Sequence, residues 1–155
     1  MPTNILRDLS RRPQGAAARV RQHNSDPHVA LLVTERASIR IELLQTQTAL
    51  AIWQRLPLYA AAEIWGNCLH FELPVDVGRE HTARLNGRAG EIYYWSEDDR
   101  VVVPWGSTPL SRPGEIRLMQ RCNVWAIALD DVTRLDGLVG GSRIGIERLR
   151  TSPPR

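Results

Sequence analysis

Two strand-like runs separated by Gly66-Asn67 constrain the fold more than any other part of the sequence. This dipeptide suits a tight two-residue turn, which places Trp65 opposite Cys68 and Glu63 opposite His70. One face of the hairpin is then polar and the other entirely apolar. The apolar face contains Ala60, Ala62, Ile64, Leu69, Phe71 and Leu73. Because a shift of one residue would mix the two faces, the sequence predicts this register and a half-buried hairpin over residues 58–73.

Similar period-two runs predict six further strands. They cover residues 28–34, 38–44, 91–95, 100–105, 123–129 and 143–149. The strands at residues 91–95 and 100–105 form a second hairpin. Residues 46–56 change to helical spacing, with Leu50, Trp53 and Leu56 on one face and Pro57 after the end. Residues 132–138 predict a short second helix and residues 106–114 a loop, while residues 78–90 form a polar stretch. The fold class is therefore mostly β: a closed antiparallel eight-stranded barrel with one main helix and a short second helix.

The positive charge of the chain is concentrated near its start. The formal net charge is +3. Residues 1–27 contain five arginines and two aspartates, whereas basic and acidic residues balance in the rest of the chain. We interpret residues 1–27 as a basic, mobile extension, residues 28–150 as the barrel domain and residues 151–155 as a tail. A neutral domain lacks the basic surface that nucleic-acid binding requires, so we expect no nucleic acid as partner.

Several classes of chemistry are excluded by residue type. All twenty basic residues are arginines, which excludes a Schiff-base lysine and the lysine of a phosphate-binding loop. No stretch approaches the ~20 apolar residues of a membrane helix, so we expect no membrane partner and a cytoplasmic location. Cys68 and Cys122 lack the spacing of metal ligands. We therefore expect no metal and no cofactor, and two free thiols, with a disulfide between them left open.

A set of short motifs accompanies these elements in a fixed order. They are Pro57, Trp65-Gly66, Phe71-Glu72-Leu73-Pro74-Val75, Tyr94-Trp95, Gly106-Ser107-Thr108-Pro109 followed by Ser111, and Asn123-Val124. In order and spacing the chain resembles the bacterial and archaeal cyclophilin-like proteins of unknown function over roughly residues 28–149. The resemblance implies an eight-stranded barrel with a filled interior and any site on its outer surface.

The resemblance does not extend to the prolyl isomerases of the cyclophilin fold. Those enzymes have an arginine upstream of a Phe-Met-x-Gln strand, with a tryptophan and a histidine later. Here the corresponding strand reads His70-Phe71-Glu72, and neither methionine lies near it in the sequence. A shared fold alone does not establish an activity, so prolyl isomerisation is not expected.

The polar face of the first hairpin is the candidate site. His70 lies opposite Glu63 and two residues from Glu72, and a histidine between carboxylates can act as a general acid or base near neutral pH. These three residues are the candidate catalytic residues. The alternative is an ordinary cross-strand pair between Glu63 and His70. Trp65 on the same face indicates a contact surface for a ligand or a second subunit.

The candidate ligand-binding residues are drawn from this face, the later strands and one loop. They are Trp65, Tyr94, Trp105, Ser107, Thr108 and Asn123. The loop at residues 106–111 can supply hydroxyl groups and backbone donors, although its glycine and prolines equally explain it as a simple turn.

Three functions stay open at this point. The first is a binding module for a small polar molecule or short peptide, with a homo-oligomer as one assembly. The second is a general acid–base enzyme, an isomerase, lyase or hydrolase, that uses His70 with Glu63 or Glu72. The third is a structural subunit of a larger assembly, in which the basic residues 1–27 dock on another chain.

Overall fold

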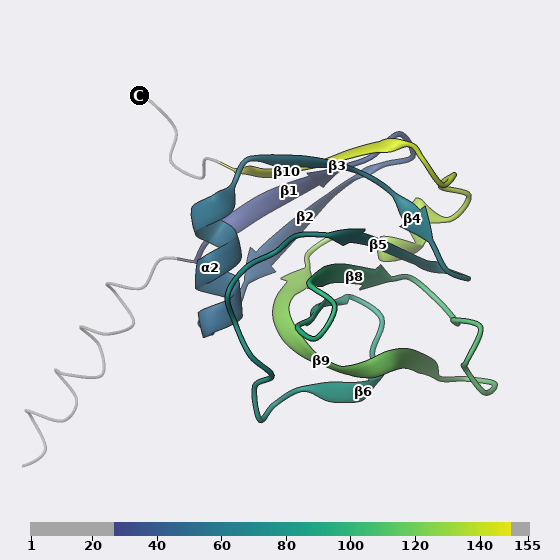
Figure 1. Cartoon of the computed structure of the whole chain (residues 1–155). Helices are drawn as coiled ribbons and strands as arrows, with labels where there is room; N and C mark the ends of the chain where they lie inside the picture. Colours follow the sequence, from purple (N-terminus) through teal and green to yellow (C-terminus); the bar gives the residue numbers. More distant parts are fainter. Residues whose placement is uncertain (1–26, 150–155) are drawn as a thin grey trace, which may run out of the picture.

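The predicted hairpin is the place where the barrel closes. The computed structural model describes residues 27–149. In it, β3 (Leu58–Ala61) and β4 (Glu63–Ile64) are two parts of one extended stretch, separated by Ala62. β3 pairs with β10 (Arg143–Arg148), whereas β4 pairs with β5 (Cys68–Glu72) on the other side. One stretch of chain thus joins the two ends of the sheet (Figure 1).

The remaining strands follow in antiparallel order around the wall. The full order is β3-β10-β1-β2-β9-β7-β8-β5-β4. The bounds are Val29–Val33 for β1, Ser38–Leu43 for β2, Glu91–Trp95 for β7, Arg100–Pro104 for β8 and Ile116–Ala128 for β9. Because β3 and β4 belong to one stretch, eight strands surround the interior, and the predicted eight-stranded barrel is confirmed.

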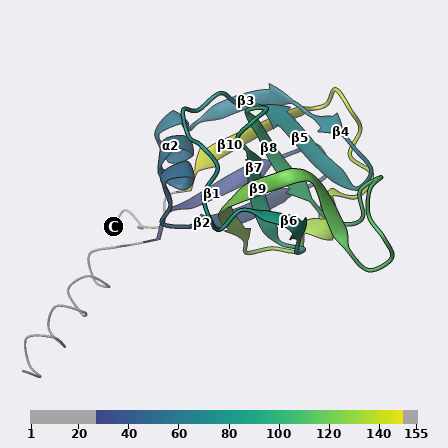
Figure 2. The same ribbon diagram turned by 60° about the horizontal axis from the view of Figure 1, so that its bottom comes forward.

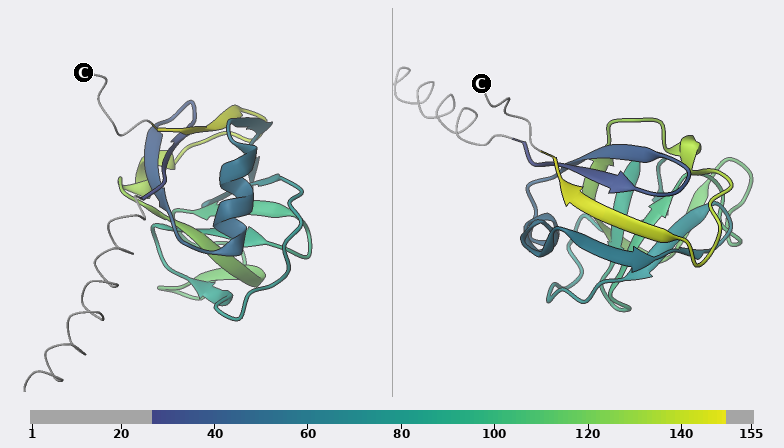
Figure 3. Two further views of the ribbon diagram at one scale, coloured as in Figure 1. Left: turned by 90° about the vertical axis from the view of Figure 1, so that its left-hand side faces the viewer. Right: turned by 90° about the horizontal axis from the view of Figure 1, so that it is seen from above.

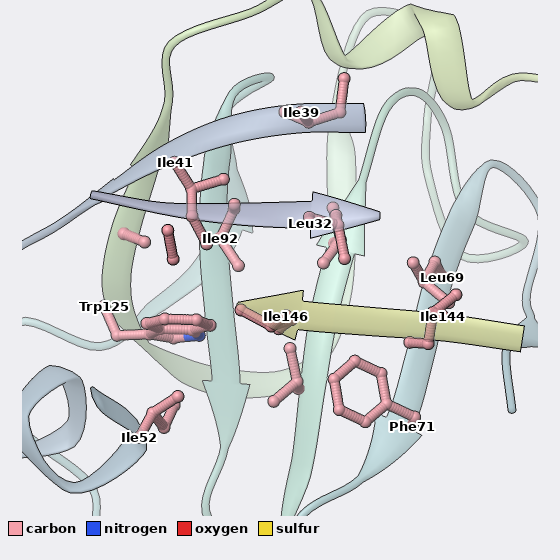
Figure 4. Close-up of a cluster of buried hydrophobic side chains, with 14 of the residues drawn as sticks. Leu32, Ile39, Ile41, Ile52, Leu69, Phe71, Ile92, Trp125, Ile144 and Ile146 are labelled. Atoms are coloured by element: carbon pink, nitrogen blue, oxygen red, sulfur yellow. The ribbon is translucent and has the colours of Figure 1, made fainter. Parts of the chain in front are cut away.

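The predicted register of the first hairpin is also confirmed. Glu63 lies opposite His70, and Ile64 lies opposite Leu69. The apolar face of the hairpin therefore points into the barrel, where Leu69 and Phe71 are fully buried. Figure 4 shows both side chains in the same buried cluster as Trp125, Ile144 and Ile146. The interior is filled with the side chains of the main core.

One helix, α2 (Gln47–Arg55), lies across one end of the barrel (Figure 3, left). The Thr46 side chain accepts a hydrogen bond from Ala49 N at 3.0 Å and caps its first turn. The predicted apolar face was partly wrong, because Leu50 is 53% exposed. The helix instead presents Ala49, Ile52 and Leu56 to the core, a set with spacings of three and four residues.

Trp53 and the predicted second helix also differ from the sequence prediction. Trp53 is half-buried at the margin of the core, where its ring stacks on His28 at 4.1 Å. Arg148 lies over the same ring at 4.7 Å. The second helix is a single 3₁₀ turn, Val132–Leu135, capped by Asp131 through its bond from Thr133 N.

A second layer on one side of the barrel was not predicted. Residues 78–90 were described only as a polar stretch, but they contain β6 (Arg84–Gly87), and β9 begins at Ile116 rather than near residue 123. The first half of β9 pairs with β6 outside the barrel wall, as Figure 2 shows. A second small core lies beneath it, made of Cys68, Tyr93, Val102, Leu118, Cys122 and Val124. The hairpin face that looked polar is therefore covered at Cys68.

Some sequence predictions lie outside the described residues. The expected extension at residues 1–27 falls almost wholly there, as does the expected tail at 151–155. Within residues 27–149, no helix has the length and apolar character needed to cross a membrane.

Candidate functional site

The outward side of the first hairpin carries a charged cluster centred on Arg100, which the sequence did not single out. Arg100 is the first residue of β8 and lies opposite Glu72. Its Nη1 donates to Glu63 Oε2 at 2.9 Å and lies 3.1 Å from His70 Nδ1. Its Nε donates to Asp98 Oδ2 at 2.9 Å. The carboxylate of Glu63 therefore binds Arg100, and Arg100 in turn contacts the histidine.

This contact determines where the proton of His70 lies. A guanidinium group only donates hydrogen bonds, so Nδ1 accepts and the neutral ring carries its proton on Nε2. Burial lowers the pKa of His70, and the charge of Arg100 lowers it further, while Glu63 and Asp98 act in the opposite direction. His70 is thus a neutral ring with an oriented N–H donor at neutral pH.

The same contact bears on acid–base catalysis. For His70 to act as a base through Nε2, its proton has to move to Nδ1, and the hydrogen bond from Arg100 has to break. Glu63 does not help, because its bond from Arg100 lowers the pKa of this carboxyl group. The predicted pairing of His70 with Glu63 is therefore present as strand register, but an arginine separates the two groups chemically.

Strand pairing brings Glu63, His70 and Glu72 close to Arg100, and Trp65 follows two residues after Glu63 at the hairpin turn. We call Glu63, Trp65, His70 and Glu72 the hairpin face. Glu63 and Glu72 are exposed, whereas Trp65 and His70 are half-buried. With Asp98 beside them and Arg100 as the cation of the cluster, carboxylates outnumber cations here. The hairpin face thus combines negative charge, an aromatic ring and one oriented donor.

The turn beside Trp65 is held rigidly. Gly66 has a positive φ of 62°, and a Cβ at this position would lie 2.8 Å from the Pro109 side chain. Asn67 N donates to Ser107 O at 2.9 Å, which joins the turn to the loop at residues 106–111. Only glycine fits this close approach, which explains the Trp65-Gly66 motif.

The predicted binding residues of that loop serve mainly to fold it. Thr108 is buried and its hydroxyl donates to Arg117 O at 2.6 Å. Trp105 is also buried, and its Nε1 donates to Asp136 at 3.2 Å. Ser107 is exposed and contributes its carbonyl group to the hairpin turn. These contacts favour the interpretation of the loop as turn chemistry.

Tyr94 lies inside the barrel wall rather than on the hairpin face. Its hydroxyl lies 2.8 Å from Leu73 O and 3.0 Å from Asp99 Oδ1, and it accepts from Val75 N at 3.2 Å. Burial raises the pKa of Tyr94 to about 12. The hydroxyl group thus anchors the chain after β5, in the segment of the Phe71-x-x-Pro-Val motif.

Asn123 is likewise internal, at the centre of a buried polar network. Its amide nitrogen donates to Thr48 Oγ1 at 3.0 Å and to Gly78 O at 2.9 Å, and its Oδ1 accepts from Glu80 N at 2.8 Å. The Thr48 hydroxyl in turn donates to Glu80 Oε2 at 2.6 Å. This network ties the long loop after β5 to the first turn of α2.

The described residues offer little for a metal or a nucleophilic thiol. Between residues 27 and 149 there is no group of three His, Cys, Asp or Glu side chains that could hold a metal ion. Cys68 and Cys122 are free and buried in the second core, and burial raises the pKa of both thiols to about 12. The reactive thiolate is therefore scarce at neutral pH.

Comparison with known proteins identifies the fold. A family model described as cyclophilin-like matches residues 28–147. The solution structure of a hypothetical protein from Archaeoglobus fulgidus superimposes with a TM-score of 0.68 at 24% identity, over 81% of this chain and 98% of that one. At this identity the likeness shows the fold alone. Among curated proteins, none matches this chain.

Proposed function

This chain belongs to the cyclophilin-like family, and because its barrel interior is filled, we propose that it is a binding module that takes its ligand on the hairpin face. The ligand is a short peptide or a small polar molecule that carries a positive charge. Glu63, Trp65, His70 and Glu72 form the site, and Arg100 holds it in place.

The observation that carries the proposal is the fixed donor at His70. Arg100 accounts for Nδ1, which leaves the opposite nitrogen as a neutral N–H donor for a carbonyl or similar oxygen of the ligand. The exposed carboxylates of Glu63 and Glu72 favour a cationic group, and the ring of Trp65 offers a surface for apolar or cation–π contact. A peptide with a basic side chain supplies all three complements.

Affinity measurements with paired variants test this proposal. Short peptides that contain arginine or lysine, and small organic amines, would be titrated by calorimetry against the full chain, Trp65→Ala and Glu72→Gln. We expect either substitution to weaken binding at least about tenfold, equivalent to about 1.4 kcal/mol. Glu35→Gln, an exposed carboxylate on the β1–β2 turn, is the matched control and should bind normally. The proposal would be contradicted if no cationic probe binds the full chain, or if Trp65→Ala and Glu72→Gln bind the probes as tightly as the full chain does.

A further inference from the structure

Half of the barrel wall has no second layer outside it. β6 and the first half of β9 cover the outside of β7 and β8 and, at Cys68, the outside of β5, with the second core between them. The right-hand view of Figure 3 looks onto β1, β2, β3 and β10, and none of residues 27–149 forms a layer over them. We call the outward side chains of these four strands the open face.

The centre of the open face is aliphatic. The second and fourth residues of β1 are buried in the barrel, so Val29, Leu31 and Val33 point outward, where they are half-buried. Tyr59, on β3, is 64% exposed, and Leu129, just beyond β9, is 43% exposed, one on each side of the face. In an antiparallel sheet with one face in solvent, the residues that point outward are usually polar. An aliphatic middle strand with exposed apolar flanks indicates a contact surface.

Opposite charges lie on the two sides of this aliphatic strand. Leu31 is opposite Arg40 in β2 and opposite Glu147 in β10, so the three side chains share one level across the sheet. The Arg40 side chain is 52% exposed, and Asp130 bonds only its Nε and Nη2. Glu147 is exposed and accepts from the Tyr59 hydroxyl at 3.3 Å. Both charged groups can thus reach a partner above the face.

We propose that the open face is the interface of a homodimer, in which two copies pack face to face about a two-fold axis along β1. Rotation about this axis exchanges the two sides of β1 and keeps each residue at its level. Arg40 of each copy then faces the partner's Glu147, and the two Leu31 side chains meet on the axis. The aliphatic side chains supply the burial, and the two charge pairs set the orientation.

The charge pattern also selects this axis among the alternatives. A two-fold axis that crosses the strands at the level of Leu31 would keep each side of β1 on its own side. Arg40 would then face Arg40 of the partner subunit, and Glu147 would face its own copy, which is repulsive. A second copy in the first orientation is therefore the occupant that fits the face best.

Charge reversal and its rescue test the dimer. Sedimentation of the full chain from micromolar to millimolar concentration should show a monomer–dimer equilibrium. Arg40→Glu and Glu147→Arg should each weaken it at least about tenfold, because each change creates two like-charge contacts. The double variant should recover most of the affinity. Arg112→Glu, in an exposed loop on the other side of the barrel, is the control and should dimerise normally.

The rescue keeps the test valid even if a single variant is less stable. Arg40→Glu places a carboxylate beside Asp130 in the single and in the double variant alike, so recovery in the double variant reports the interface. A chain that stays monomeric at every concentration, or a dimer indifferent to both reversals, would overturn the proposal. If the full chain is monomeric and dimerises only after residues 1–26 are removed, these residues cover the open face of their own chain. That result would also overturn the homodimer proposal for the full chain.

Cross-linking tests the axis separately. Leu31→Cys places a thiol on the two-fold axis, so a short bifunctional thiol reagent that spans the ~10 Å between face-to-face sheets should link the two copies. Ser38→Cys places an exposed thiol on the same face but off the axis, opposite Gly145 of the partner subunit, and should cross-link poorly. Cys68 and Cys122 are buried and do not compete. Equal cross-linking of the two variants would contradict the orientation. None of Leu31, Arg40 and Glu147 belongs to the hairpin face, so failure of the dimer leaves the binding proposal intact.

Discussion

At the scale of single residues, Arg100 has the largest effect on the chemistry of the hairpin face. It bonds Glu63 and Asp98 and at the same time donates to His70. The hydrogen bond from Arg100 therefore decides which ring nitrogen of neutral His70 carries the proton. The arginine was not a sequence candidate, because strand register shows which residues are neighbours only when both strands are assigned as a pair.

The pKa of His70 should rise when Arg100 is replaced. In Arg100→Gln the repulsion between two positive charges disappears, whereas the carboxylates of Glu63 and Asp98 remain and favour the charged imidazolium. An NMR titration of the imidazole signals of His70 in both proteins measures this change. Arg40→Gln removes a distant ion pair and should leave His70 unchanged. A constant or lower pKa in Arg100→Gln would show that the arginine does not control this ring.

The sign of the pH dependence of stability follows from the same pKa. The folded protein holds His70 with a lowered pKa, so the unfolded chain binds the proton more readily. The contribution of His70 is therefore fully present above its unfolded pKa and is lost as the pH falls through the acidic range toward the folded pKa. Arg100 and the half-buried position of the ring both act in this direction.

At the scale of elements, Asn123 holds the loop after β5 against the helix. Asn123→Ala would leave Glu80 N and the Gly78 carbonyl group without their buried partner, and should destabilise the fold by about 2–4 kcal/mol. Asn86→Ala is the matched control: Asn86 is exposed, bonds only the Arg117 side chain among the contacts described, and should cost below about 1 kcal/mol. Urea unfolding gives both values, and similar values for the two would refute this role.

The orientation of α2 gives a second prediction at this scale. Ile52→Ala removes a fully buried side chain and should cost about 2–5 kcal/mol, whereas Leu50→Ala changes an exposed one and should cost less than about 1 kcal/mol. Thermal or urea unfolding of the two variants measures the difference. If Leu50 proves the costlier position, the helix lies on the barrel with the face that the sequence predicted.

At the scale of the whole molecule, the barrel was more predictable than its second layer. The hairpin at Gly66-Asn67 was predictable because two alternating faces and a turn agree on one register, and Glu63 does lie opposite His70. β6 was not, because its sequence, Arg-Leu-Asn-Gly, has no clear alternation and gains its place by pairing with β9. The alternation of residues within a short segment does not show that the segment pairs with a strand far away in the sequence.

The candidate site shows the same division. Period-two alternation predicted Glu63, Trp65 and His70 on one face, and the structure has Glu63 opposite His70 in the predicted register. Tyr94 and Asn123 are residues with polar side chains in predicted strands. The sequence pattern is the same whether such a side chain binds a ligand or bonds within the protein. Only their partners, Leu73 O for the first and Thr48 for the second, show that these groups bond within the protein.

The second layer also makes a prediction for the whole molecule. Cys68 on β5 and Cys122 on β9 are buried in the second core, and the pKa of each thiol is raised to about 12, so both should react slowly with a disulfide reagent at pH 8 in the native protein. Reactivity should rise with urea in step with unfolding. Fast labelling of either thiol in native buffer would show that the layer opens independently of the barrel.

The central claim is that ligands bind outside the filled barrel, on the hairpin face. It is tested most directly by NMR mapping of the full chain with an arginine-containing short peptide. We expect the indole signal of Trp65 and the ring signals of His70 to shift first and saturate together, while the signals of the buried Trp125 stay in place. Shifts confined to other surfaces, or shifts of Trp125 that report entry into the barrel, would contradict it.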